Sequence, residues 1–293
     1  MQVESFLPKE LYHYTSWKTF EKIVKNRTWR FSSINDTNDL SENLNLYLKQ
    51  LLSDKDLISN IALDTKNNII RHIDANNYYD SKKFFIACFS EKKDDLGQWR
   101  VSYGDYGQGV CIGINPKYFT KRQFNKNSEC LGWAKITYEI SEQKILLKNI
   151  TKKFEKYNDD GYIEDNSLEL SWELRDVAML MKHKAFHIEN EFRLIVPMID
   201  DEILDENFYL PKVDFNKNEK KQLDKYIDYD LTSEAREGDK NLFTSILLGR
   251  DCKKDKKDVK KILKEYGFDI SNLSISKSNI PYRFSDDRIK KKK

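Results

Sequence analysis

The segment KFFIACFS, residues 83–90, is a mostly apolar run between charged residues, which is the pattern of a buried strand. Two further segments have the same character. GVCIGI (109–114) sets Val110, Ile112 and Ile114 on one side, and EFRLIVP (191–197) ends at Pro197. Shorter strands are predicted at LYHYTS (11–16), TWRFSS (28–33), AKITYE (134–139), TSILLG (244–249) and LSISKS (273–278).

Helical spacing of apolar residues separates these strands. Ser16 is placed to cap a helix in which Trp17, Phe20, Ile23 and Val24 recur. Further helices are predicted around 41–63, 171–187, 216–229 and 255–266, while the polar region 142–170 has no clear assignment. The stripe of the helix at 171–187 consists of Leu174, Val177, Ala178, Met181 and Ala185.

The chain shows no internal repeat and no Pro/Gly/Ser-rich linker, so residues 1–293 are expected to form a single domain that ends in a basic tail, 284–293. The mixture of strands and helices predicts an α+β fold, with a mixed or antiparallel sheet as its core and helices covering it.

Charge and cysteine content exclude several classes of protein. The 51 basic and 48 acidic residues leave a net charge of +3, so there is no chain-wide field for nucleic acid, and runs such as KKDKKDVKK (253–261) are typical of solvated helix faces. The sequence contains no C-x-x-C pair, the spacing that would suggest a zinc site or a redox dithiol. The apolar surroundings of Cys88 and Cys111 predict buried thiols. With no signal peptide or membrane-spanning pattern, we expect a cytoplasmic protein without a membrane partner.

Two motifs suggest chemistry only weakly. HKAFHIENE spaces His183, His187 and Glu191 four residues apart, but the helical pattern stops near 187, so helix-terminal histidines are favoured over a metal site. YGDYGQG (103–109) has three glycines without the lysine of a phosphate loop. It is either a turn before a strand or one wall of a site for a flat ligand.

The segment EFRLIV carries a stronger signal. Alternation along the strand turns Phe192, Leu194 and Val196 to one face and Glu191 and Arg193 to the other. The two charges form either a plain ion pair or, in a cleft, a site for a polar ligand in which Arg193 keeps Glu191 ionised. His13, between Tyr12 and Tyr14, is either a packed structural residue or part of a nucleotide site.

Several segments, in this order, resemble the bacterial domain-of-unknown-function family 2971, over residues 11–283. They are LYHYTS, TWRFSS and NDTND, then FIACFSE and GQWRVSYGDYGQGVCIGI, then ENEFRLI and SKSNIPYR. The opening histidine, the aromatic second strand and the late E-x-E strand are also similar to the ADP-ribosyltransferase superfamily. No tyrosine clearly matches the middle residue of that superfamily's H-Y-E triad.

The second resemblance implies an ADP-ribosyltransferase-like fold with NAD as a substrate and no metal. His13 would bind the adenosine ribose, Glu191 would bind the nicotinamide ribose, and Glu189 would direct the acceptor. His13 and Glu191 are then expected to face one cleft. The expected binding residues are Tyr14, Thr15, Arg30, Phe31, Ser32, Asn38, Trp99, Tyr103, Tyr106 and Arg193.

Three functions therefore stand as hypotheses. The first is ADP-ribosyl transfer or NAD glycohydrolysis, as a toxin or anti-phage defence effector with a nucleic-acid or protein acceptor and with a partner such as an antitoxin. The second is a non-catalytic module that binds a nucleotide or a protein. The third is a metal-dependent hydrolase or nuclease that uses His183 and His187.

Overall fold

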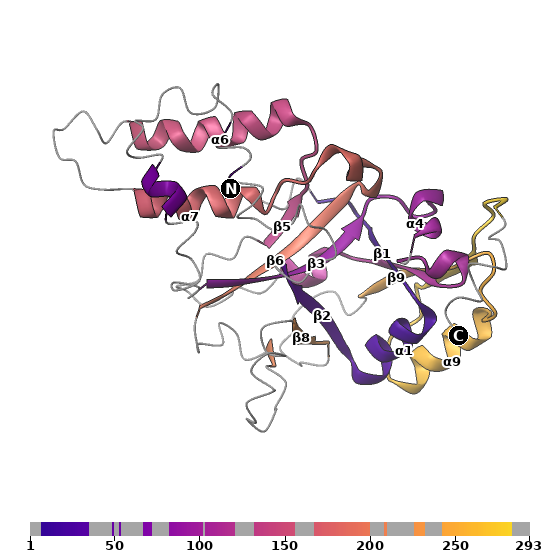
Figure 1. The fold of residues 1–293 in the computed structure, drawn as a ribbon. Helices are drawn as coiled ribbons and strands as arrows, with labels where there is room; N and C mark the ends of the chain where they lie inside the picture. Colours follow the sequence, from indigo (N-terminus) through magenta and orange to yellow (C-terminus); the bar gives the residue numbers. More distant parts are fainter. Residues whose placement is uncertain are drawn as a thin grey trace.

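The fold is α+β, built on a mixed sheet (Figure 1). The computed structural model describes residues 7–34, 49, 53, 67–71, 82–101, 103–120, 132–155, 167–199, 208–209, 226–231 and 242–282. Within these residues the sheet has ten strands. They are β1 (Leu11–Thr15), β2 (Thr28–Ser33), β3 (Lys82–Ser90), β4 (Val110–Ile114), β5 (Gly132–Lys135), β6 (Glu191–Ile199), β7 (Phe208–Tyr209), β8 (Tyr226–Asp230), β9 (Phe243–Leu248) and β10 (Ser274–Lys277).

The sheet branches at β3. One path runs β10-β9-β4-β1-β3-β2-β8-β7, and β6, with β5 beyond it, pairs with β3 along its whole length. β1 meets β3 at a single pair of residues, Tyr12 and Ser90, whereas β2 pairs with the middle of β3. Only β9 and β10 are parallel; the other pairs are antiparallel. β3, which corresponds to the apolar run at 83–90, is therefore the strand that joins the two arms.

Two helices cover one face of the sheet. They are α1 (Trp17–Asn26) and α9 (Lys256–Glu265), which lie side by side (Figure 1). Ser16 caps α1 by accepting from the backbone N–H of Thr19, as predicted. The core on this face is rich in aromatic side chains, including Phe20, Trp29, Phe31, Phe89, Phe119, Trp133 and Phe192.

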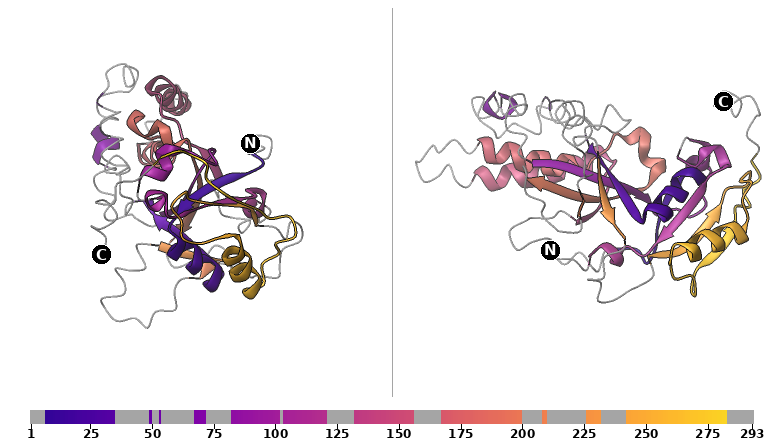
Figure 2. Two further views of the ribbon diagram at one scale, coloured as in Figure 1. Left: turned by 90° about the vertical axis from the view of Figure 1, so that its right-hand side faces the viewer. Right: turned by 90° about the horizontal axis from the view of Figure 1, so that it is seen from below.

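The other face has two separate covers. Over β3 and β6, the helices α6 (Ile140–Glu155) and α7 (Ser167–Ala178) pack on Ile86 and Ile195. Over β1, β4 and β9, the short helix α4 (Leu96–Arg100) packs its Trp99 on Tyr14. Figure 2 shows α6 and α7 at one end of the molecule and α1 and α9 at the other.

Two predicted helices are wrong in part. The helix at 171–187 ends at Ala178, because the chain leaves it to pair with Thr137: Thr137 N–H donates to the Leu180 carbonyl and Lys182 N–H donates to the Thr137 carbonyl. The helix at 216–229 is wrong for residues 226–229, which form β8, because Ile227 and Tyr229 alternate into the core. The helix predicted at 41–63 lies almost entirely outside the described residues.

Two further features differ from the prediction. α6 and the start of α7 fall in the region 142–170 that had no assignment. The described apolar residues buried there are Leu147, Ile150 and Leu170, too few among the lysines and acids to give a clear helical pattern. Cys88 is exposed, although Cys111 and Cys252 are buried. No helix within the described ranges combines the length and apolar character needed to cross a bilayer.

Candidate functional site

Between α6–α7 and α4, the sheet face carries a strip of mostly polar residues. It consists of Tyr12, Cys88, Ser90, Glu191 and Arg193, and we call it the polar seam. Directly opposite residues of β3 and β6 share a face, and the register pairs Ser90 with Glu191 and Cys88 with Arg193. The same register, through the pair Tyr12 and Ser90, puts Tyr12 of β1 on this face. Cys88 is exposed while its chain neighbours are buried, so solvent reaches the sheet here.

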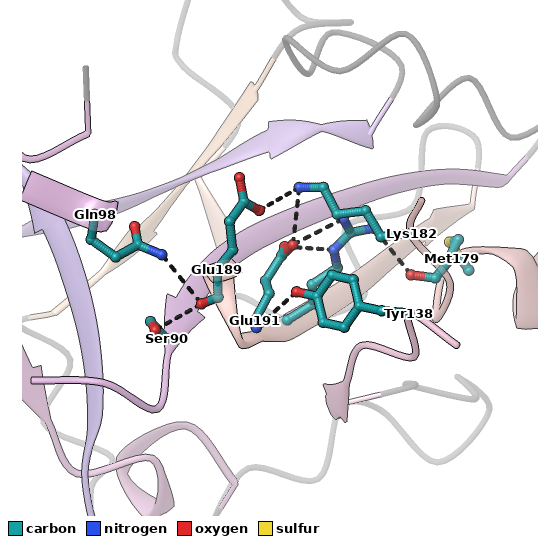
Figure 3. Close-up of polar contacts among 8 residues, drawn as sticks. Ser90, Gln98, Tyr138, Met179, Lys182, Glu189 and Glu191 are labelled. Carbon is teal, nitrogen blue, oxygen red and sulfur yellow. Dashed lines mark hydrogen bonds and ion pairs between the residues drawn. The ribbon is translucent and has the colours of Figure 1, made fainter. Parts of the chain in front are cut away.

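Four charged side chains form what we call the charged cluster: Lys182, Glu189 and Glu191, which are labelled in Figure 3, and Arg193, which pairs with Glu191. Lys182 Nζ lies 2.7 Å from Glu189 Oε2 and 3.2 Å from Glu191 Oε2. Arg193 Nε donates to Glu191 Oε1 at 2.7 Å and its Nη2 donates to Oε2 at 3.3 Å. Arg193 Nη1 also donates to the Met179 carbonyl at 3.1 Å. Two carboxylates and two cations thus balance one another.

The backbone around the cluster is fixed by hydrogen bonds from neighbouring elements. Buried Gln143 of α6 donates to the carbonyls of Thr137 and Lys182, which sets the position of the lysine. Glu191 N–H donates to the Tyr138 hydroxyl at 3.0 Å. The three elements that supply the cluster are therefore held together before any ligand binds.

The carbonyl of Glu189 connects the cluster to α4. It accepts from the Ser90 hydroxyl at 2.8 Å and from the Gln98 side-chain amide at 3.2 Å (Figure 3). Glu189 ends a short 3-10 helix, Lys184–Glu189, and Asn190 follows it with a φ of 45°. This left-handed residue lets the chain turn from the helix directly into β6, so that Glu189 and Glu191 meet the same lysine.

Electrostatics keep Glu191 ionised. Burial alone would raise the pKa of its carboxyl group, but the charges of Arg193 and Lys182 and the hydrogen bond from Arg193 outweigh burial and lower the pKa to about 2. Burial also raises the pKa of the Tyr138 hydroxyl, which therefore stays protonated. Neither group can exchange a proton with a substrate near neutral pH.

Exposure distinguishes the two carboxylates. The side chains of Glu191, Lys182 and Arg193 are 4%, 5% and 1% exposed, whereas that of Glu189 is 17% exposed. A ligand on this face can therefore reach Glu189 directly. Glu191 is more deeply buried, and its carboxylate holds Arg193 and Lys182 in place by pairing with both.

The structure does not bring His13 and Glu191 into one cleft. Neighbouring residues of a strand face opposite sides of the sheet, and Tyr12 is the residue on the Glu191 face. The His13 ring lies on the aromatic-core side, with its centroid 5.2 Å from that of Trp29 and 5.8 Å from that of Phe89. His13 Nδ1 lies 2.9 Å from the Cys88 carbonyl oxygen. Burial lowers the pKa of His13, which favours the neutral ring.

Tyr14 and Trp99 lie on the same face as the seam. Their rings pack edge to face with centroids 4.9 Å apart, and both side chains are buried. The Tyr14 hydroxyl donates to the Lys92 carbonyl and accepts from Asp95 N–H, while Trp99 Nε1 donates to Asp94 Oδ1. These two aromatics hold α4 on the sheet, and neither has an open ring face for a ligand.

The exposed aromatic next to α4 is Tyr103, which is 43% exposed. It adjoins Gly104, whose N–H donates to the Gln98 carbonyl, and Gln98 in turn contacts Glu189. Tyr106 packs beside Trp99 with a φ of 53°, a left-handed conformation that is uncommon for a bulky residue. Of the predicted stacking residues, Tyr103 is thus the one with an exposed ring, and its chain neighbour Gly104 is linked to Glu189 through Gln98.

Other predicted binding residues lie away from the seam. Arg30 is paired with Asp228 by two hydrogen bonds of 2.8 Å and lies 3.5 Å from the centroid of the Tyr226 ring. Phe31 is fully buried in the aromatic core, Ser32 is exposed on β2 and Thr15 is buried on β1. Asn38 lies outside the described residues.

The histidines of the metal hypothesis do not share a helix face. His183 precedes the 3-10 helix, where its Nδ1 accepts from Ala185 N–H, and His187 Nδ1 contacts the Lys184 carbonyl. Both are exposed. Across the described part of the chain, no three His, Cys, Asp or Glu side chains gather as metal ligands would.

The glycines of YGDYGQG belong to a turn. Gly109 N–H donates to the Gly104 carbonyl, and the carbonyls of Gly107 and Gly109 accept from Asp251 and Gly249. These backbone contacts connect the turn to the loop after β9 and favour the turn interpretation over a ligand wall.

Sequence reasoning missed four residues of the site, which are Ser90, Gln98, Tyr138 and Lys182. Nothing in MKHKAF distinguishes Lys182 from Lys184, which pairs with exposed Glu139 instead. The one usable signal was the E-x-E-x-R pattern, since two acids so close to a single arginine, one of them buried, favour a further cation nearby.

A comparison with protein families bears on the identity of this region. The model of the family described as "Protein of unknown function (DUF2971)" matches the chain from α4 into β6. The match covers residues 98–194, about a third of the chain. The match includes Gln98, Tyr138 and all four members of the charged cluster, and it confirms the resemblance seen in the sequence. The chain has no match among curated proteins or among solved structures.

Proposed function

We propose that the chain is an ADP-ribosyltransferase-like enzyme that cleaves NAD at the charged cluster, with Glu189 as the carboxylate that acts on the nicotinamide ribose. The observation that supports this proposal is the contrast between the two acids of the E-x-E motif. Glu191 is sealed and bound by Arg193 and Lys182, whereas Glu189 shares Lys182 and is partly exposed.

The reaction breaks the bond between the ribose C1′ and the nicotinamide nitrogen, and the bonding electrons leave with nicotinamide. Positive charge then develops on the ribose, and a fixed carboxylate stabilises that charge more in the transition state than in the ground state. Water or an acceptor hydroxyl attacks C1′ and loses its proton to solvent. Tyr103 offers an exposed ring for the planar nicotinamide.

This proposal differs from the sequence hypothesis in the role of two residues. His13 has no part in it, because its ring lies on the opposite face from the cluster. Glu191 becomes a positioning residue that sets Arg193 and Lys182. The acceptor, a toxin or defence role and the cytoplasmic location stay predictions.

The test is nicotinamide release from NAD, measured by chromatography for the wild type, Glu189→Gln and a control, Glu139→Gln, whose exposed carboxylate pairs with Lys184. We expect release by the wild type and by the control, and a loss of about a hundredfold or more in Glu189→Gln. Equal release by all three proteins would remove Glu189 from the mechanism, and no release by the wild type would remove the enzyme proposal.

A second candidate is a non-catalytic nucleotide-binding module. It is favoured by the pairing of both acids with cations, which reduces the charge available to stabilise a ribosyl cation. It predicts that NAD raises the melting temperature without being consumed. Protection of exposed Cys88 from a thiol reagent by NAD would locate the ligand at the seam in either case.

A further inference from the structure

Two segments of this chain that meet on one surface are enriched in basic residues. Residues 17–27 and 250–265 contain twelve Lys or Arg and five Asp or Glu, which is a net charge of +7, against +3 for the whole chain. The remainder of the chain is therefore net negative by four. Both segments centre on a helix, α1 and α9, and these two helices contact each other (Figures 1 and 2).

In α1 the lysines form one stripe. Lys18, Lys22 and Lys25 recur at helical spacing and are exposed, whereas Phe20, Ile23 and Val24 are buried. At 3.6 residues per turn, the lysines lie directly opposite the buried residues. The stripe therefore points straight away from the core.

In α9 the arrangement is the same. Exposed Lys257, Lys260, Lys261 and Lys264 lie opposite a buried face of Val259, Ile262 and Leu263. The acids of the first turn are used locally: Asp255 accepts from the N–H groups of Lys257 and Asp258, and the Asp258 side chain accepts from Asp255 N–H. Because both helices bury their apolar faces in the same core, the two stripes face solvent together.

We infer that these seven lysines form a surface that binds the phosphate backbone of duplex nucleic acid, independently of the proposed NAD chemistry. Each stripe spans about 10 Å along its helix, and packed helices lie about 8–10 Å apart. A duplex carries one negative charge per about 1.7 Å of its axis, so several phosphates can face the stripes at once.

The composition of the surface favours nucleic acid over a membrane. Helices that bind at a membrane surface place large apolar side chains beside their lysines. Within the described residues, the exposed large hydrophobic side chains are Val101, Tyr103, Ile140, Ile145, Trp172 and Ile188, and none belongs to α1 or α9. A surface of lysines without exposed apolar residues fits a hydrated polyanion.

The test measures binding of the full chain to a fluorescent 20-base-pair DNA duplex of mixed sequence at 50, 100 and 200 mM salt. We expect sequence-independent binding that weakens by about a hundredfold or more across this range, as for four or more phosphate contacts. In the variant Lys257→Gln/Lys260→Gln/Lys264→Gln, we expect affinity at 50 mM salt to fall about tenfold or more. The slope of log K against log salt should become shallower by about two to three.

The control variant is Lys9→Gln/Lys148→Gln/Lys152→Gln, which removes the same charge from exposed lysines elsewhere. Its binding should stay within about twofold of the wild type. The inference is overturned by an absence of binding at 50 mM salt, by equal losses in the two variants, or by an unchanged salt slope in the α9 variant. Binding to phosphatidylglycerol vesicles but not to the duplex would overturn it in favour of a membrane. Circular dichroism of both variants is the check that they are folded.

Discussion

Glu191 and Arg193 lie two residues apart on β6 and form a forked ion pair, with Nε to Oε1 at 2.7 Å and Nη2 to Oε2 at 3.3 Å. Both side chains are almost completely buried. Residues two apart on a strand project from the same side of the sheet, so Glu191 and Arg193 can pair without help from any other element. Lys182, from outside the sheet, completes it.

Glu191→Gln should destabilise the protein strongly, since it leaves the charges of Lys182 and Arg193 buried with a single carboxylate. Breaking a buried ion pair costs about 3–5 kcal/mol in the free energy of unfolding. For Glu191→Gln this loss is measured as a fall in the urea midpoint of unfolding. Glu139→Gln, which breaks the exposed pair with Lys184, should cost about 1 kcal/mol or less. Comparable losses for the two variants would contradict the role given to the charged cluster.

The same carboxylate should make stability depend on pH in the acid range. Its pKa is about 2 in the folded protein against 4.5 ordinarily, so the unfolded state binds the proton first as pH falls. The contribution of Glu191 is fully present above about pH 5 and is lost between about pH 4.5 and pH 2. Urea unfolding at pH 6, 5, 4 and 3 should therefore show a smaller decline for Glu191→Gln than for the wild type. Identical pH slopes for the two proteins would mean that the pKa of Glu191 is not lowered.

His13 should affect stability in a different pH window. Because burial lowers the pKa of its ring below the ordinary 6.5, the unfolded chain binds the proton more readily, and stability falls as pH drops below about 6.5. His13→Gln should remove this decline between about pH 6.5 and pH 5, while His183→Gln, an exposed control, should keep it. Nicotinamide release, if observed, should persist in His13→Gln. A specific loss of turnover in a folded His13→Gln protein would return His13 to the site.

Local patterns predicted much of the fold. Apolar runs and alternation placed β2, β3, β4, β6, β9 and β10. Helical spacing with a predicted Ser16 cap placed α1, and α9 was predicted without a cap. The errors occur where contacts between distant segments compete with local preference. Residues 179–182 leave α7 to pair with Thr137, and Ile227 and Tyr229 alternate as a strand beside β2.

The candidate site was predictable only in its β6 portion. Strand alternation correctly turned Glu191 and Arg193 to one face, where they form an ion pair. Lys182 could not be found, because its position depends on the end of α7 and on Gln143 of α6. The expectation that His13 faces the same cleft as Glu191 was wrong. Neighbouring residues of a strand face opposite sides of the sheet, so the Glu191 side carries Tyr12 and not His13. The sequence alone does not reveal the register between β1 and β3 that decides this.

The turn before β4 provides a test of close backbone packing. A Cβ at Gly109 would clash with the Thr15 carbonyl oxygen and would lie 2.9 Å from the Gly104 carbonyl oxygen. Neither backbone can retreat, since the Gly104 carbonyl accepts from Gly109 N–H at 3.1 Å and Thr15 is held in the sheet by its pairing with Val110. Gly109→Ala should therefore lower the free energy of unfolding by about 1–3 kcal/mol, measured by urea unfolding.

Gly132 offers the matched control for this substitution. Its φ of 64° is left-handed, but a Cβ there would meet nothing within 4 Å. Gly132→Ala should therefore cost only the backbone term of about 1 kcal/mol. If Gly109→Ala proved neutral while Gly132→Ala did not, crowding at the turn would be absent. The turn would then have room beside β1, and a role as one wall of a ligand site would again be open to it.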